Sequence, residues 1–308
     1  MQTQVVVQLA TTVVASLLGL ALAGRVLRPL RSLAATAQRI SDTDLTQRIE
    51  VRARDEASQI ADAFNDMLAR LEASFTTQRQ FLDDTSHELR TPLTVIRGHI
   101  ELMEFDESPV ERAGTIALVT DEIDRMNQIV SDLFVLARAD RPGFCTFEPM
   151  DLQDLILTAH QKMSALAPRD WQIRVPPEVL ITADRNRLTQ ALLQLADNAV
   201  KHAGDDATIQ VGADVDNDGV RLWLADSGPG VSENEVEEIF ARFKRGGKRS
   251  GRSSGAGLGL SIVSAIAQAH GGSVALVPQR GGGAHFEMTI PRDHRGSALP
   301  WSITRVAP

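Results

Sequence analysis

The chain has 308 residues, of which 43% are hydrophobic and 23% are charged, so its composition supports more than one folded domain and excludes a disordered protein. The formal net charge of -8 argues against nucleic acid as a partner. The single cysteine, Cys145, excludes an internal disulfide, and no group of cysteines and histidines has the spacing of a zinc site. A reducing, cytosolic setting fits best.

The first apolar segment, Val5 to Gly24, holds twenty residues without a charge and is followed by Arg25, Arg28 and Arg31. At about 1.5 Å per residue it would cross a bilayer core of roughly 30 Å. The arginines predict that the rest of the chain lies in the cytoplasm, so we expect residues 1–27 to be a transmembrane helix with a short N-terminus. A signal peptide is the alternative, although there the charges precede the apolar run. The short N-terminus leaves no room for an extracellular sensor, which is consistent with an N-terminally shortened form.

Two short helical stripes follow in residues 28–77, with steps of three and four residues typical of a coiled-coil seam. The first stripe comprises Leu30, Leu33, Ala37 and Ile40, and the second comprises Ile60, Phe64, Met67 and Leu71. Pro29 inside the first stripe, and the pair Asp55 and Glu56 before the second, resemble the HAMP linker of membrane receptors. Two ordinary surface helices are the alternative interpretation.

A single helix is predicted to continue beyond the linker, because no glycine or proline occurs from Asp55 to Thr91. Its apolar seam changes phase between Leu71 and Leu82, which is the pattern of a coiled-coil stutter. We interpret this change of phase as a joint for signal transmission.

The segment "SHELRTPL" lies on this helix, and continuing the seam places Ser86 in the interior and His87 on the water-exposed flank. Thr91 lies one turn further on the same side, and Glu88 is adjacent to His87. A neutral imidazole is nucleophilic near neutral pH, and a neighbouring carboxylate can fix its tautomer and balance its charge during phosphoryl transfer. A surface histidine without a function is the alternative.

A second seam follows the turn "FDESPVE" and comprises Ile116, Val119, Ile123, Met126, Val130 and Leu133. Two antiparallel helices with one apolar stripe each cannot close a core alone. We therefore expect residues 78–140 to pair with a second copy as a dimeric antiparallel four-helix bundle, which makes the protein a homodimer.

The heptapeptide "HELRTPL" resembles the signature of the dimerisation and phosphoacceptor domain of sensor histidine kinases. The resemblance implies that His87 accepts the phosphoryl group. It further implies that Glu88 assists the transfer and that Thr91 helps to position water when a partner is dephosphorylated.

A new domain is predicted in residues 146–292, after the break at "PGFC". Helical patterns at Leu152–Leu166 and Arg187–His202 alternate with strand patterns at "TIQVGADV" and "VRLWLADSG", which predicts an α+β sandwich. The motifs "LLQLADNAVKHA", "DSGPG", "FARFKRG" and "GAGLGLSIV" follow in that order. Together they resemble the Bergerat ATP-binding fold of histidine kinases, gyrase, Hsp90 and MutL.

The first motif is the candidate magnesium and phosphate site. The side-chain oxygen of Asn198 suits Mg²⁺, and Lys201 and His202 can meet phosphate oxygens one helical turn later. Gyrase-like ATPases have a glutamate four residues before this asparagine to activate water. Gln194 stands there and cannot act as a base, so transfer is favoured over hydrolysis, although asparagine is the commoner kinase residue.

The second motif is the candidate adenine site. The carboxylate of Asp226 can accept the adenine amino proton, while Gly228 and Gly230 allow the backbone to approach the base. An aspartate that only starts a turn also fits "DSGPG", but it leaves the other motifs unexplained.

The last two motifs are candidates for phosphate binding and a lid. Gly255, Gly257 and Gly259 open a helix, whose free amides favour anions. Arg242 could compensate charge during transfer, and Arg245 could do so from the basic segment Lys244–Gly255, which predicts a mobile lid. A solvated basic loop is the alternative for the other lid cations. The resemblance adds four nucleotide contacts, namely Phe240, Phe243, Leu258 and Leu260.

These features predict a kinase of the bacterial inner membrane that autophosphorylates on His87 with ATP and Mg²⁺. Its catalytic domains would lie in the cytoplasm, and it would pass the phosphoryl group to an aspartate of a response regulator receiver domain. The alternatives are an idle or phosphatase-biased scaffold for the regulator, and an ATPase. No chemistry is assigned to His99, His160, His270, His285 or His294, and residues 293–308 are expected to form a flexible tail.

Overall fold

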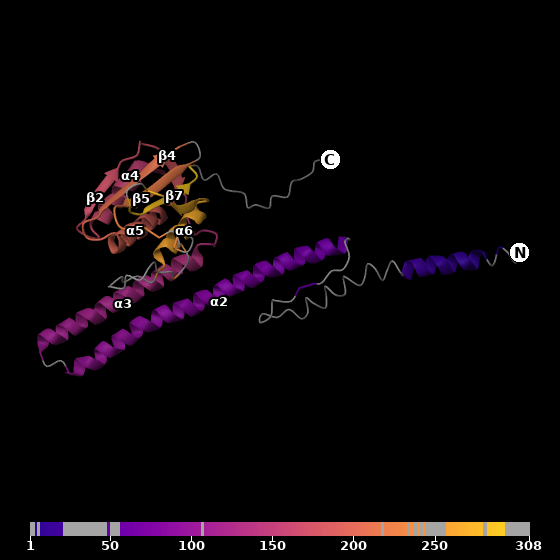
Figure 1. The fold of residues 1–308 in the computed structure, drawn as a ribbon, viewed down its shortest axis with the longest axis horizontal. Coiled ribbons are helices and arrows are strands. Elements are labelled where there is room, and N and C mark those ends of the chain that lie inside the picture. Colours follow the sequence, from indigo (N-terminus) through magenta and orange to yellow (C-terminus); the bar gives the residue numbers. More distant parts are fainter. Residues whose placement is uncertain are drawn as a thin grey trace. The chain divides into compact units, whose positions relative to one another are not determined.

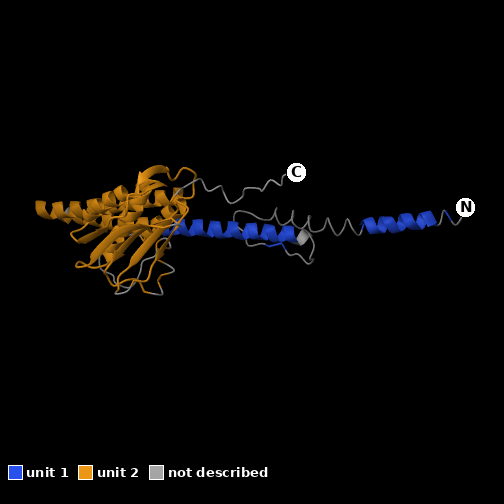
Figure 2. Ribbon diagram, turned by 90° about the horizontal axis from the view of Figure 1, so that it is seen from above, with its two compact units in different colours: residues 1–86 blue, residues 87–308 orange. Residues whose placement is uncertain are grey.

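The structure is a computed structural model that describes residues 4, 7–20, 48–49, 56–105, 108–216, 219–232, 235–236, 239–240, 243, 257–279 and 282–292. The chain divides into two compact units, Met1–Ser86 and His87–Pro308, which are coloured separately in Figure 2. The first predicted HAMP stripe and the predicted tail, residues 293–308, lie outside the described residues.

The first unit contains a helical segment at residues 7–20. Within the described ranges, no helix combines the length and the apolar character needed to cross a bilayer. The predicted span, Val5 to Gly24, has both of its ends outside the described residues.

The long helix predicted after the linker is confirmed: α2 runs without interruption from Glu56 to Leu102 over 47 residues. Near its start, the side-chain amide of Asn65 accepts a hydrogen bond from the N–H of Ile49 and donates one to the carbonyl of the same residue, at 2.9 and 3.1 Å. Ile49 is buried, as are Ala61 and Leu68 on the helix. A short piece of the predicted linker is therefore fixed to α2 by Asn65 and by an ion pair between Arg48 and Glu72.

The second unit begins with the last part of α2, followed by a short 3-10 helix, η1 (Met103–Phe105), and then by α3 (Pro109–Arg138). The start of α3 is strongly specified by its sequence. The Ser108 hydroxyl accepts from the N–H of Glu111, the Glu111 carboxylate accepts from the N–H of Ser108, and proline occupies the first helical turn. This capping box fixes the turn at which the helical hairpin reverses (Figure 1).

The rest of the second unit has the predicted α+β architecture (Figure 1). Its elements are β1 (Glu148–Asp151), α4 (Leu152–Ser164), β2 (Asp170–Arg174), β3 (Leu180–Ala183), α5 (Arg185–His202), β4 (Thr208–Val215), β5 (Val220–Asp226), α6 (Gly259–Ala269), β6 (Ser273–Leu276) and β7 (His285–Ile290). β1 and β3 pair antiparallel, and the larger sheet has the order β2-β4-β5-β7-β6 with only β2 and β4 parallel. The two predicted strands and two predicted helices are confirmed, with α4 ending two residues early and α5 starting two residues early.

The core of this α+β part lies between the larger sheet and a layer of three helices. α5 packs between α4 and α6, and all three helices contact the sheet. The strands supply alternate residues to this core, as in the registered row Val211, Leu224 and Phe286. On the opposite face of the sheet, the indole of Trp223 covers Gly212 and donates to the carboxylate of Asp214 at 2.9 Å.

A polar cluster joins the linker after α3 to the ends of two helices. The Asp184 carboxylate accepts from the N–H of Arg187, where it caps α5, and from the N–H of Thr146 in the linker, at 3.0 and 2.8 Å. The N–H of Asp184 donates to Nε2 of His270, whose Nδ1 lies 2.8 Å from the carbonyl of Ile266. His270 is buried at the C-terminus of α6, and these two contacts assign it a proton on Nδ1. These contacts give His270 a structural role and account for its presence without catalytic chemistry.

The thiol of Cys145 adjoins this cluster, with its Sγ 3.8 Å from Nδ1 of His270. Burial raises the pKa of this thiol from an ordinary 9.0 to about 11, and the Asp184 carboxylate acts in the same direction, while Arg187 opposes them.

We predict that iodoacetamide modifies Cys145 at pH 8 about 100-fold more slowly in the native protein than in the urea-unfolded chain, because the thiolate is the reactive form. The modification rate, followed by mass spectrometry, should keep rising up to about pH 11 in the native protein. Equal native and unfolded rates would contradict the burial of this thiol.

Candidate functional site

His87 lies on α2 with an exposed side chain, as predicted. The Thr91 hydroxyl donates to the carbonyl of His87 at 3.3 Å, which confirms that the two residues lie one turn apart on one side of the helix. Glu88 is half-buried next to them. Pro92 is the only proline inside α2, and because it has no N–H, the helix lacks one backbone hydrogen bond within the signature, directly after Thr91.

The predicted apolar seams of this hairpin are not covered within the single chain. Large side chains that remain more than one third exposed include Leu93 and Ile100 on α2 and Ile116, Ile123 and Val130 on α3. Ser86, predicted to lie in the interior, is also exposed in the single chain. Its burial therefore requires a second copy and stays a prediction.

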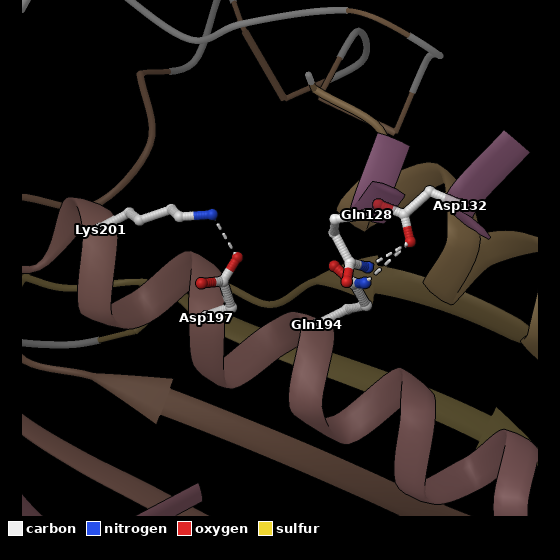
Figure 3. Close-up of polar contacts among 5 residues, drawn as sticks. All are labelled: Gln128, Asp132, Gln194, Asp197 and Lys201. Atoms are coloured by element: carbon white, nitrogen blue, oxygen red, sulfur yellow. Dashed lines mark hydrogen bonds and ion pairs between the residues drawn. The ribbon is translucent and has the colours of Figure 1, made fainter. Parts of the chain in front are cut away.

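The candidate magnesium and phosphate residues lie in the last two turns of α5. Asn198 is half-buried, and no described residue forms a hydrogen bond with its side chain. Lys201 forms an ion pair with Asp197, one turn earlier on the same helix (Figure 3), while His202 is exposed at the helix end. Before Lys201 can bind phosphate, it has to leave or share the Asp197 carboxylate.

The candidate adenine residue, Asp226, ends β5 and is only 6% exposed. Its Oδ1 accepts from the N–H of Gly228 at 2.9 Å and from the N–H of Ala284 at 3.3 Å. These two bonds fix the carboxylate, and no described residue donates a hydrogen bond to Oδ2. The geometry therefore suits a carboxylate that accepts a further hydrogen bond from a ligand.

The backbone around Asp226 is packed so closely that glycine is required. A Cβ on Gly228 would lie 2.5 Å from Cα of Ala203, and a Cβ on Gly283 would lie 1.8 Å from the carbonyl oxygen of Asp226. Gly230 has φ +75 and meets the carbonyl of Gly283. Gly228 and Gly230 thus allow close contact with Ala203 and Gly283, while the predicted approach of their backbone to an adenine base stays a prediction.

The third and fourth motifs meet through the backbone, since the N–H of Phe243 donates to the carbonyl of Gly257 at 3.0 Å. Phe243 has the uncommon positive φ of 60, and Phe240 packs edge-on against Phe286 in the core. Leu258 is buried and precedes Gly259, where α6 begins without a side-chain cap. Leu260 is half-buried on the first turn. Arg242, Arg245, Gly255 and the predicted lid lie outside the described residues.

One contact that the sequence did not predict joins α3 to α5. The carboxylate of Asp132 accepts from the side-chain amides of Gln128 and Gln194 at 2.9 and 3.5 Å (Figure 3). Burial raises the pKa of Asp132 from an ordinary 3.8 to about 6, since a buried carboxylate is costly to ionise. The only sign of this contact in the sequence is that an acidic residue lies between Ile129 and Leu136. These two residues form a second apolar stripe on α3, beside the predicted dimer seam.

The described residues contain no group of three or more histidine, cysteine or acidic side chains that could hold a metal ion by themselves. The amide oxygen of Asn198 is a hard ligand of the type that Mg²⁺ prefers. The residues present thus fit a magnesium ion that is bound together with phosphate oxygens.

An exposed histidine on a helical hairpin and an α+β module with a buried aspartate and glycine motifs together define an ATP-dependent histidine kinase. Comparison with protein families supports this class. The model of the HAMP domain matches residues 21–73, that of the His Kinase A (phospho-acceptor) domain matches residues 77–142, and that of the histidine kinase-, DNA gyrase B- and HSP90-like ATPases matches residues 183–294.

Relatives support the same family. "Sensor protein CutS" of Streptomyces coelicolor is 36% identical over 92% of this chain and 70% of the relative. "Probable sensor histidine kinase TcrY" of Mycobacterium tuberculosis is 34% identical over 94% of this chain and 65% of the relative. The chain belongs to the sensor histidine kinases of two-component systems.

Solved structures agree at the level of the fold. Full-length ShkA in complex with AMPPNP is 32% identical, with a TM-score of 0.51 over 69% of this chain and 45% of that chain. Histidine kinase ThkA in complex with the response regulator protein TrrA has a TM-score of 0.59 at 24% identity, over 72% of this chain and 64% of that chain.

The glycines beside Asp226 provide a matched test of the adenine site. Gly282 and Gly283 have φ of +90 and +89, so alanine is similarly strained at both, by about 1–2 kcal/mol. Only at Gly283 does the new Cβ strike the carbonyl of Asp226, since at Gly282 the nearest atom is 3.8 Å away. We predict that Gly283→Ala weakens the binding of a fluorescent ATP analogue at least about tenfold. Gly282→Ala should weaken it by less than about threefold, and equal losses would contradict this role of Gly283.

Proposed function

We propose that this kinase phosphorylates His87 with ATP and Mg²⁺ and then transfers the phosphoryl group to an aspartate of a response regulator receiver domain. The observation that carries the proposal is the exposed imidazole of His87, on the same helix side as Thr91, in a chain that also holds a nucleotide module. Exposure allows a nucleophile to be reached both by the donor and by the protein that receives the phosphoryl group.

In the first step, a ring nitrogen of neutral His87 attacks the terminal phosphorus of ATP, and the bond to the bridging oxygen of ADP breaks. The carboxylate of Glu88 orients the ring and offsets the positive charge that the imidazole gains. In the second step, a receiver aspartate takes the phosphoryl group. Thr91 positions water when the receiver is dephosphorylated.

The nucleotide would be held by the glycine-rich module. Asp226, fixed at Oδ1, accepts a hydrogen bond from the adenine amino group, and the amides at the start of α6 receive the phosphates. Asn198 would hold the magnesium ion, which offsets phosphate charge when bound. Lys201 and His202 contact phosphate oxygens, and Phe240, Phe243, Leu258 and Leu260 surround the nucleotide. Arg242, together with Arg245 and Gly255 of the predicted lid segment, would complete the site. The solved complex of ShkA with AMPPNP is consistent with such a site.

Two copies would form the kinase. The uncovered apolar residues of α2 and α3, with Leu93, Ile100 and Ile123 about half exposed, suit a four-helix bundle made by two hairpins. A regulator would then dock on the bundle near His87, in keeping with the solved complex of the kinase ThkA with the response regulator protein TrrA. Residues 1–27 would anchor the dimer in the bacterial inner membrane, with the catalytic domains in the cytoplasm.

The proposal is tested by incubating the purified full chain with γ-labelled ATP and Mg²⁺. We expect label that is stable in alkali and lost in acid, because phosphohistidine is acid-labile. His87→Gln should reduce the label at least about 100-fold. The matched control, His99→Gln, changes a histidine on the same helix outside the signature and should keep the label.

Two results would contradict the proposal. Equal labelling of wild type and His87→Gln would place the phosphoryl group elsewhere. No label on wild type, together with binding of a phosphorylated receiver domain, would favour the scaffold alternative. When label forms, adding a receiver domain should move it from the kinase to the receiver, and it should not do so when the receiver aspartate is replaced by asparagine.

A further inference from the structure

The nucleotide module contacts α3 along a stripe separate from the dimer seam. Ile129 and Leu136 are each only 3% exposed and belong to the same buried cluster as Leu258 and Ile262 at the start of α6. Asp132 lies between them on the same face of α3 and is 8% exposed. An acidic side chain is thus buried at the centre of an otherwise apolar contact.

Gln194 receives this acidic group on the nucleotide side. Its Nε2 donates to Oδ1 of Asp132 at 3.5 Å, while its Oε1 lies 2.8 Å from the position that a Cβ on Gly259 would occupy. One amide therefore touches α3 with its nitrogen and the first residue of α6 with its oxygen. Asn198 follows Gln194 by one turn on the same helix, so the contact reaches from the phosphoacceptor hairpin to the candidate phosphate site.

We propose that Asp132 and Gln194 form an interdomain latch that docks the nucleotide module on α3, holds it in a resting arrangement, and opens when Asp132 loses its proton. Asp132 is in this sense a positioning residue, since it acts on the nucleotide site through Gln194. The proposal rests on the kinase activity proposed above for its effect on labelling, but the docking itself can be measured without catalysis.

The docked arrangement of this chain is a resting one because His87 stays exposed in it. Phosphoryl transfer requires the donor phosphorus and the accepting nitrogen to be roughly 3–3.5 Å apart. The module is instead held on the stripe of Ile129, Asp132 and Leu136. It has to leave this stripe before its nucleotide can meet the imidazole.

The charges around Asp132 set the direction of the pH effect. Burial raises its pKa to about 6, the hydrogen bond from Gln128 opposes this change, and of the charged residues nearby Asp197 raises the pKa and Lys201 lowers it. α6, which also packs against α3, has no titratable side chain. Because the pKa is higher in the docked state than the ordinary 3.8, docking takes up a proton. Docking therefore weakens as the pH rises from about 4 to about 6 and stays weak above that range.

Docking can be measured by pulsed electron paramagnetic resonance between two spin labels on the full chain. The labels are attached at Thr120→Cys on α3 and Asp206→Cys on the nucleotide module, with Cys145→Ser removing the native thiol. Labelled chains are diluted with excess unlabelled chain, so that only distances within one chain contribute. We expect the docked fraction, relative to the undocked fraction, to fall about fourfold from pH 5.5 to 7.5.

Two substitutions of Asp132 separate protonation from simple loss of a contact. Asp132→Asn mimics the neutral acid and should keep a narrow, docked distance distribution at both pH values. Asp132→Ala removes the acceptor and should give a broad distribution at both. Asp121→Asn, at an exposed acidic position on the same helix, should behave as the unsubstituted chain does. A distribution that is unaffected by pH, or equally affected by pH in Asp132→Asn, would overturn the latch.

Autophosphorylation gives the functional readout. Both chains share every step of the reaction except the one that involves Asp132, so the ratio of the wild-type rate to the Asp132→Asn rate isolates the latch. This ratio should rise about fourfold from pH 5.5 to 7.5, and Asp132→Ala should be labelled faster than wild type at pH 5.5. A constant ratio combined with pH-dependent docking would show that docking does not restrain the kinase. An unlabelled wild type would instead refute the proposed activity, while the distance measurement would still decide the latch.

Discussion

The donor and the acceptor of this reaction lie on different structural elements, and this separation constrains the whole molecule. The imidazole of His87 projects from a helix into solvent, whereas the candidate nucleotide residues belong to an α+β module with its own core. His87 must be reachable first by the nucleotide module and then by the receiver domain, so the nucleophile cannot be permanently covered. The module that supplies ATP must therefore approach and leave, and the contacts that hold it away are as important as those that bind the nucleotide.

The structure answers this constraint with two kinds of connection. The cluster of Asp184, His270 and Thr146 ties the segment after α3 to the module through hydrogen bonds of 2.8 to 3.1 Å, which suits a permanent joint. The contact of Asp132 with Gln194 contains a carboxylate whose ionised form is disfavoured, which suits a joint that opens. The two joints differ because the Asp184 carboxylate accepts two backbone hydrogen bonds of 2.8 and 3.0 Å, whereas Asp132 accepts from Gln194 at 3.5 Å and burial disfavours its ionised form.

Much of this fold could be predicted from the sequence, because the signals are local. The uninterrupted helix α2 follows from a run without glycine or proline, and β4 and β5 follow from alternating apolar residues. β1, β3 and β6 have four residues each, too few for a reliable period. At the site, the exposure of His87 and the position of Asp226 at the end of a strand were predictable, whereas the two hydrogen bonds that fix the Asp226 carboxylate were not. The roles of Asp132 and His270 were not, because each depends on partners that are distant in the chain and brought close only by packing.

The central claim, that His87 is the residue that receives the phosphoryl group from ATP, is tested most directly by locating that group. The full chain is incubated with ATP and Mg²⁺, digested at neutral pH and sequenced by tandem mass spectrometry, with Asp226→Asn as the nucleotide-site control. The account predicts one phosphorylated peptide, modified on His87, which is lost in Asp226→Asn. A phosphoryl group confined to another residue, or present equally in Asp226→Asn, would contradict it.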